Sequence, residues 1–218
     1  MLCSPAMRRS IGYFAVLALL VLPAAAQTPD AMWHSLEEGN RVFVAGKVTF
    51  ANLAELRHES AKHQNPPVTV LSCSDSRVPP ELVFNRSLDQ LFVIRVAGNV
   101  ASPFDLASIE YAIKNGYTKL IVVLGHEECG AVRAALATTN PGTPSLDALV
   151  ERIRESFNGI PRNTEPRTVH RAVEANARAS AAYLLKNSEV IRNAVSSGRV
   201  GLISAYYDLS TGVVERLR

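Results

Sequence analysis

With 218 residues, the chain is long enough for one α/β domain with a sizeable hydrophobic core. Its 47% hydrophobic and 20% charged residues are typical of a globular protein. The formal net charge is only +3, without a basic run or an aromatic ladder, so the composition argues against nucleic acid as a partner.

The N-terminus has the layout of a secretory signal peptide. Two arginines precede an apolar stretch at residues 11–22, and the small residues that end at Ala26 form a cleavage site. A membrane anchor is the alternative, but the apolar stretch is shorter than the ~20 residues needed to span a bilayer. We expect residues 1–26 to be a signal peptide and residues 27–218 to form a single domain. The mature protein would be nearly neutral, secreted into the periplasm and free of the membrane after cleavage.

Hydrophobic periodicity and the positions of proline and glycine predict helices that alternate with strands. In chain order, the first half is predicted to contain helices at 30–46 (with Asp30 as N-cap) and 52–62, a strand at 68–72, a helix start at 79–81, a strand at 91–96 and a helix at 105–115. The second half is predicted to contain a strand at 119–124, helices at 129–137, 145–156, 168–185 and 189–196, a strand at 200–207, and a turn at 208–212 that leads into a hairpin. This order predicts an α/β fold with a central, mostly parallel β-sheet flanked by helices and an antiparallel edge strand.

Two short motifs follow predicted buried strands. Cys73 comes directly after the strand at 68–72, while His126 and Cys129 follow the strand at 119–124. Side chains just past the carboxyl ends of parallel strands converge on one crevice. Two thiols and one imidazole form the donor set of a catalytic zinc site, with a fourth position left open. We therefore predict a Zn²⁺ site, with His126 and Cys129 one turn apart at the start of a helix.

A disulfide is the alternative interpretation of the cysteines. Cys3 would leave with the signal peptide, so the mature chain would keep only Cys73 and Cys129. Two cysteines in an oxidising compartment often form a disulfide. A structural disulfide needs neither a histidine three residues before one cysteine nor an Asp-x-Arg sequence after the other. Metal ligation explains both, and the spacing favours zinc.

Asp75 and Arg77 follow Cys73 closely enough to point into the same crevice. Asp75 could accept the proton of zinc-bound water and so orient the hydroxide, while a two-pronged pair with Arg77 keeps Asp75 ionised. Asp75 could instead become the fourth metal ligand and close the site. A salt bridge that only stiffens the loop is the third possibility. Because two thiolates neutralise the charge of zinc, we expect activity to rise on the alkaline side of neutrality.

Four motifs resemble those of the β-class carbonic anhydrases: CSDSRVPPE at 73–81, FVIRVAGN at 92–99, GHEECGAV at 125–132 and YDLSTGxV at 207–214. The resemblance covers roughly residues 31–217. It implies a zinc enzyme that interconverts carbon dioxide and bicarbonate through zinc-bound hydroxide, with Asp75 and Arg77 as a catalytic dyad. It also implies self-association as a dimer or tetramer, with the N-terminal helices packing on a partner subunit.

The resemblance further implies five substrate-binding positions: Gln64, Val78, Phe92, Tyr111 and Gly130. Gln64 would hydrogen-bond substrate, although a surface amide explains it equally well. Phe92 and Tyr111 of one subunit would line the active-site pocket of its partner. Packing in the hydrophobic core would explain the two rings equally well. Gly130 would offer its backbone amide, and Val78 would form an apolar wall, because carbon dioxide offers almost nothing to hydrogen-bond.

The sequence is also compatible with two other functions. An enzyme that hydrolyses carbon disulfide or carbonyl sulfide could use the same scaffold, since substrate access and not the zinc ligands would distinguish it. A non-catalytic zinc-binding protein is the other alternative. The Asp75–Arg77 pair argues against it, because metal storage needs no such dyad.

Overall fold

The computed structural model describes residues 28–50, 52–139 and 142–218, so the predicted signal peptide lies outside the described residues. Five strands form one sheet in the order β2-β1-β3-β4-β5. They are β1 (Val68–Ser72), β2 (Leu91–Arg95), β3 (Leu120–His126), β4 (Gly201–Tyr207) and β5 (Val214–Arg216). The first four strands pair in parallel and β5 is antiparallel to β4. The predicted sheet, including its antiparallel edge, is confirmed.

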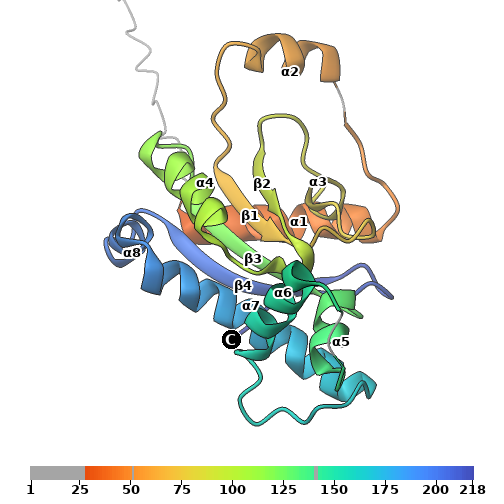
Figure 1. Cartoon of the computed structure of the whole chain (residues 1–218). Coiled ribbons are helices and arrows are strands. Elements are labelled where there is room, and N and C mark those ends of the chain that lie inside the picture. The colour runs from red at the N-terminus through yellow and green to blue at the C-terminus, as the bar shows by residue number, and fades with distance from the viewer. Residues whose placement is uncertain (1–27, 51, 140–141) are drawn as a thin grey trace, which may run out of the picture.

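Helices flank this sheet in the described part of the chain, and only α2 stands away from it (Figure 1). They are α1 (Pro29–Val44), α2 (Leu53–Ser60), α3 (Pro80–Val83), a 3-10 turn η1 (Ala97–Asn99), α4 (Pro103–Lys114), α5 (Gly130–Leu136), α6 (Pro144–Arg154), α7 (Pro166–Asn187) and α8 (Glu189–Ser196). Within the described part of the chain, none is long and apolar enough to cross a bilayer.

Both faces of the sheet are covered, as a parallel sheet requires. On one face, Trp33 and Leu36 of α1 pack against Val70 of β1. On the other, residues of α4, α7 and α8 pack around Leu71, the next residue of the same strand. Every residue of β1 and β3 is therefore buried. Side chains of these two segments can become accessible only beyond the ends of the strands. α2 lies apart from this layered body and buries none of its residues (Figure 1).

Among the helix starts that differ from the prediction, two involve an acidic residue in the first turn of the helix. Thr28, not Asp30, caps α1, because its hydroxyl accepts a hydrogen bond from the backbone N–H of Ala31 at 3.1 Å. α4 begins at Pro103, and Asp105 lies inside its first turn, where its carboxylate accepts from the backbone N–H of Ser102 at 2.8 Å. In both cases an acidic residue of the first helical turn, where the helix dipole favours negative charge, resembles an N-cap in the sequence.

Candidate metal centre

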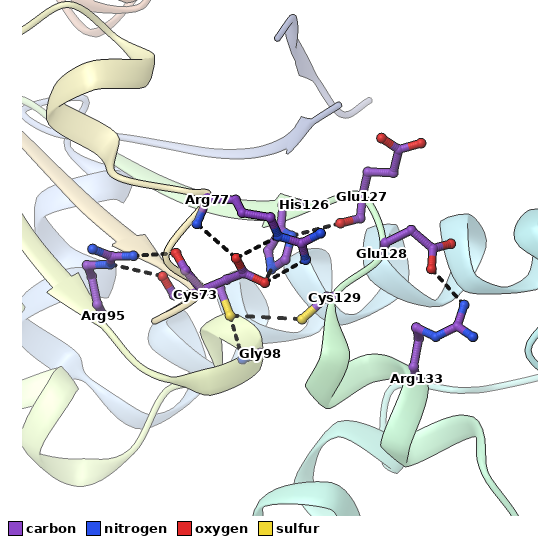
Figure 2. A network of polar contacts seen from close by, with 10 residues as sticks. Cys73, Arg77, Arg95, Gly98, His126, Glu127, Glu128, Cys129 and Arg133 are labelled. Atoms are coloured by element: carbon purple, nitrogen blue, oxygen red, sulfur yellow. Dashed lines mark hydrogen bonds and ion pairs between the residues drawn. The ribbon is translucent and has the colours of Figure 1, made fainter. Parts of the chain in front are cut away.

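The ends of β1 and β3 bring three metal-ligating side chains together. The ligand atoms of Cys73, His126 and Cys129 all lie within 4.8 Å of one another. Figure 2 shows the two sulfurs facing each other, and they are 4.0 Å apart. Two thiolates on one tetrahedral zinc, each with a Zn–S bond of about 2.3 Å, are separated by about 3.8 Å. A disulfide requires about 2.05 Å, and both cysteines are free thiols in this structure.

His126 is oriented by the chain that follows it. Its side chain is fully buried at the last position of β3. The Nδ1 atom donates to the backbone carbonyl of Glu127 at 2.8 Å, which leaves the lone pair on Nε2 (Figure 2). Nε2 is buried and has no hydrogen-bond partner among the described residues. A buried nitrogen without a partner requires an explanation, and a metal ion beside the two sulfurs provides one.

The turn between His126 and Cys129 differs from the prediction of one helical turn. His126 ends β3, and Cys129 is the N-cap of α5, in extended conformation. Between them, Glu128 adopts a left-handed backbone with φ of 52°. That conformation costs a non-glycine residue about 1 kcal/mol, and here it reverses the chain so that the Cys129 sulfur faces the imidazole. The side chain of Glu128 is held on α5 by an ion pair with Arg133 at 2.7 Å.

Cys73 accepts a hydrogen bond from the turn that follows β2. The backbone N–H of Gly98 lies 3.3 Å from the Cys73 sulfur. Gly98 has a φ of +70°, which strains any residue with a side chain, and a Cβ there would also press on the end of the Ile153 side chain at 2.7 Å, so glycine is strongly favoured. The buried Asn176 of α7 donates to the carbonyl of Gly98 at 2.6 Å and holds this turn in place.

The two thiols lie close enough to shift each other's pKa in opposite directions. The hydrogen bond from Cys129 lowers the pKa of Cys73 to about 4, against the opposing effect of burial. The same hydrogen bond, together with burial, raises the pKa of Cys129. Cys73 is therefore the easier of the two thiols to deprotonate, and Cys129 holds its proton more strongly. Coordination of both sulfurs expels the remaining proton, so metal affinity should increase with pH.

Asp75 and Arg77 form a two-pronged ion pair beside these ligands. Oδ1 of Asp75 accepts from the Arg77 backbone N–H and from Nε, both at 2.9 Å, and Oδ2 accepts from the guanidinium at 2.7 Å. These bonds from Arg77 hold the pKa of Asp75 well below its usual range. Oδ2 also lies 4.0 Å from Nε2 of His126. Arg77 therefore binds both carboxylate oxygens of Asp75 in this structure.

Arg95 is a site residue that the sequence analysis missed. It ends β2 and stands opposite Ser72 in the parallel register. Its Nε donates to the carbonyl of Cys73 at 3.0 Å, and its terminal nitrogen donates to the carbonyl of Asp75 at 2.6 Å (Figure 2). Arg95 thereby fixes the backbone that carries Cys73 and Asp75. The FVIRVAGN motif contains this arginine, but nothing in the sequence indicates which carbonyls it binds.

The five predicted substrate-binding residues do not form a compact cluster like that of the three metal-ligating side chains. Phe92 of β2 and Tyr111 of α4 stack with ring centroids 6.4 Å apart, and Tyr111 is half exposed. Gly130 opens α5 beside Cys129, and nothing lies within 4 Å of where its Cβ would be. Val78 is fully buried and packs in the same core cluster as Val70. Gln64 is exposed in the segment before β1.

Comparisons with known proteins agree with this geometry. A family model described as carbonic anhydrase matches residues 68–214. Carbonic anhydrase 2 of Mycobacterium tuberculosis is 37% identical over 195 residues, which are 84% of this chain and 90% of that protein. The carbonic anhydrase of Mycolicibacterium smegmatis is 35% identical over 196 residues, covering 86% and 92% of the two chains.

Solved structures give the same result. One of the tetrameric β-carbonic anhydrases from Sordaria macrospora superposes with a TM-score of 0.68 at 25% identity, covering 86% of this chain and 97% of that one. The Coccomyxa β-carbonic anhydrase in complex with acetazolamide gives a TM-score of 0.67 at 25% identity, over 88% and 86% of the chains. Sequence, fold and the Cys-His-Cys group thus agree, and the chain belongs to the family of β-class carbonic anhydrases, which are carbonate dehydratases.

Proposed function

We propose that this protein is a zinc-dependent carbonic anhydrase that interconverts carbon dioxide and bicarbonate. The observation that carries this proposal is the unpartnered, buried Nε2 of His126, which faces two sulfurs and lies 4.0 Å from a carboxylate held by an arginine. The donor set fits zinc, because soft thiolates and a neutral imidazole are its preferred ligands. Cys73, His126 and Cys129 would hold the ion, which supplies Lewis acidity and makes hydroxide available near neutral pH.

Asp75 has the role of orienting the attacking water. The carboxylate stays ionised at neutral pH because Arg77 holds its pKa low. It can therefore accept a hydrogen bond from the attacking water and direct the free lone pair of that water at the carbon of carbon dioxide. Arg77 fixes the position of the carboxylate through both oxygens, and Arg95 fixes the backbone below it. Bicarbonate and one proton are the products.

The proposed substrate pocket includes Gln64, Val78, Phe92, Tyr111 and Gly130. Gly130 is exposed beside the proposed ligand Cys129, with open space around the position of a Cβ, and its backbone amide would contact a bound oxygen. Phe92 and Tyr111, which stack on each other, would line the pocket of the partner subunit and supply the apolar surface that an uncharged substrate needs.

The test of this function is stopped-flow hydration of carbon dioxide by the zinc-loaded protein, together with metal analysis by mass spectrometry. We expect one zinc per chain and hydration that is abolished by chelation and restored by Zn²⁺. Parallel assays with carbonyl sulfide and carbon disulfide test the hydrolase alternative. Zinc binding without turnover of any of these substrates would identify a non-catalytic zinc protein.

The pH dependence of the reaction is a further expectation. Two thiolates neutralise the formal charge of Zn²⁺, so its water is less acidic than at an all-imidazole site, and kcat should rise between about pH 6 and about pH 9. Asp75 does not produce this rise, since its pKa lies well below neutrality. Stopped-flow assays across this range measure the profile, and a flat profile would contradict the expectation.

We also propose that the chain is exported to the periplasm after cleavage of residues 1–26. The support is the arrangement of arginines, apolar stretch and small residues described above. N-terminal sequencing of the protein from a periplasmic fraction should begin at Gln27. Recovery of the uncleaved chain from the cytoplasm would contradict this proposal.

Self-association through the β2–α4 side is the last part of the proposed function. Solved relatives from Sordaria macrospora are tetrameric, and β2 is an edge strand here. Phe104 of α4 is 85% exposed, close to the half-exposed Tyr111 on the same helix. Such rings are typical of surfaces that become buried on association, and α2 would pack on the partner.

We expect Phe104→Asp to weaken self-association at least about tenfold, because it places a charge in the proposed interface. Sedimentation velocity over a dilution series measures the effect. Leu146→Asp is the matched control, since Leu146 is an exposed apolar residue on α6. Equal effects of the two substitutions, or none, would show that the interface lies elsewhere.

A further inference from the structure

Glu127 makes hydrogen bonds in three directions from a single position between two metal ligands. Its backbone N–H donates to the carbonyl of Tyr207 at 2.8 Å, and its carbonyl accepts from Nδ1 of His126 at 2.8 Å. Its carboxylate points away from the imidazole (Figure 2) and accepts from Ser210, from the backbone N–H at 3.0 Å and from the hydroxyl at 2.8 Å. One residue thus connects the buried imidazole to the turn between β4 and β5.

That turn is itself held on the core. The carboxylate of Asp208 accepts from both the backbone N–H and the hydroxyl of Thr211, at 2.7 and 2.9 Å. Asn40 of α1, which is 4% exposed, donates to the carbonyl of Gly212 at 2.8 Å and accepts from the backbone N–H of Val214 at 2.9 Å. Hydrogen bonds therefore fix the turn on both sides of Ser210. Ser210 is thus a fixed hydrogen-bond partner for the Glu127 carboxylate.

The peptide group after Glu127 needs such a support. Its carbonyl faces Nδ1 of His126 beside a left-handed Glu128, whose φ of 52° is a conformation that L-residues adopt at a cost. Arg133 holds the side chain of Glu128 on one side of this peptide group, and Ser210 holds that of Glu127 on the other. Without the contact between Ser210 and the Glu127 side chain, the Glu127 carbonyl is free to rotate away from His126. The imidazole then loses the hydrogen-bond partner that sets its tautomer.

We propose that Glu127 is a positioning residue, which holds the imidazole of His126 in the Nδ1–H tautomer through its contact with Ser210. This inference rests on the metal site proposed above, because the tautomer matters for presenting Nε2 to an ion. Glu127 does not touch the ligand atoms. It acts through its own carbonyl, and the hairpin turn β4–β5 thereby becomes part of the metal site's support.

The first test is the affinity of the purified chain for Zn²⁺, measured by competition with a chromophoric chelator. Glu127→Ala should bind zinc about tenfold more weakly, as loss of an outer partner of a ligating histidine does. Glu127→Gln should bind nearly as wild type, because its amide oxygen still accepts from Ser210. Ser210→Ala, which removes one of two donors at an exposed turn, should cost about threefold. Glu215→Ala, an exposed glutamate on β5, is the matched control and should have no effect.

The second test does not depend on metal. Nitrogen-15 NMR of the metal-free protein should show the Nδ1–H tautomer of His126 in the wild type and in Glu127→Gln, and a mixture with the Nε2–H tautomer in Glu127→Ala. A wild-type protein that binds no zinc would overturn the proposed function, while the tautomer would still decide this inference. The role of Glu127 would be overturned if Glu127→Ala left both the zinc affinity and the His126 tautomer unchanged. It would also be overturned if the Ala and Gln variants lost equal amounts of zinc affinity. If Glu127→Ala does not fold, Ser210→Ala decides by the same two measurements.

Discussion

Replacing Asp75 by alanine should reduce kcat/KM for carbon dioxide hydration by about 10²-fold, the usual cost of misplacing a reacting group such as the attacking water. The carboxylate lies 4.0 Å from Nε2 of His126, and Arg77 directs it there through both oxygens. Zinc content should be unchanged, because both oxygens bind Arg77 and the ligand set of three is complete without Asp75. Stopped-flow assays with metal analysis on the same sample measure both quantities.

Asp30→Ala is the matched control, since Asp30 is an exposed aspartate of the first turn of α1. Its activity should equal that of the wild type. Full activity in Asp75→Ala would remove Asp75 from the mechanism. A parallel loss of zinc in that variant would instead indicate that Asp75 is a ligand, as in the closed alternative.

The Asp75–Arg77 pair also has a predictable effect on stability. Because Arg77 lowers the pKa of Asp75 in the folded protein, the pair stabilises the fold at neutral pH. That contribution is present above the pKa of an unfolded-state aspartate, about 3.9, and is lost as the pH falls toward the folded-state value. The pair therefore remains intact over the entire neutral range in which activity is measured.

Replacing Cys129 by serine should abolish both zinc binding and activity. Serine is close to cysteine in size, so the buried site at the start of α5 should still fold, but a hydroxyl does not deprotonate to a soft ligand. We expect less than about a tenth of an equivalent of zinc to be retained, because only two ligands are left. Zinc should raise the Tm of the wild type and leave that of Cys129→Ser unchanged, since only a state that binds metal is stabilised by it.

Ser76→Ala is the control for this experiment, because Ser76 is exposed in the loop that carries Cys73. It should retain zinc and activity. Wild-type zinc affinity in Cys129→Ser would show that the ligand set is wrong. Thiol counting on the active protein should find both cysteines reduced, and a disulfide between Cys73 and Cys129 would exclude the metal centre.

Much of the site was predictable because it is built at strand ends. The strands β1 (68–72) and β3 (120–126) are continuous runs of buried residues, and a parallel sheet places their carboxyl ends at one edge. Any ligand directly after such a strand must therefore lie at that edge, which is why Cys73, His126 and Cys129 could be grouped without a structure. The ion pair of Asp75 with Arg77 was predictable for a similar reason, since both residues lie in one short loop.

Local backbone geometry was less predictable. The turn from His126 to Cys129 was expected to be helical, but the structure places a strand end, a left-handed Glu128 and an N-cap there. Glutamate seldom adopts that conformation, and no residue pattern indicates it in advance. Here the surrounding hydrogen bonds and the ion pair with Arg133 override the local preference of the chain.

The amino-acid sequence by itself determined the fold class, the three ligand types and the loop that carries Asp75, because hydrophobic periodicity and strand-end positions are local properties. The tertiary structure alone decided how these groups are held: Arg95 on the carbonyls of Cys73 and Asp75, Asn176 behind Gly98, and Ser210 on Glu127. Each of these contacts joins segments that are distant in the sequence, and most end on backbone atoms. Every residue has the same backbone donor and acceptor, so the identity of such a partner depends on the path of the chain and not on its residue types.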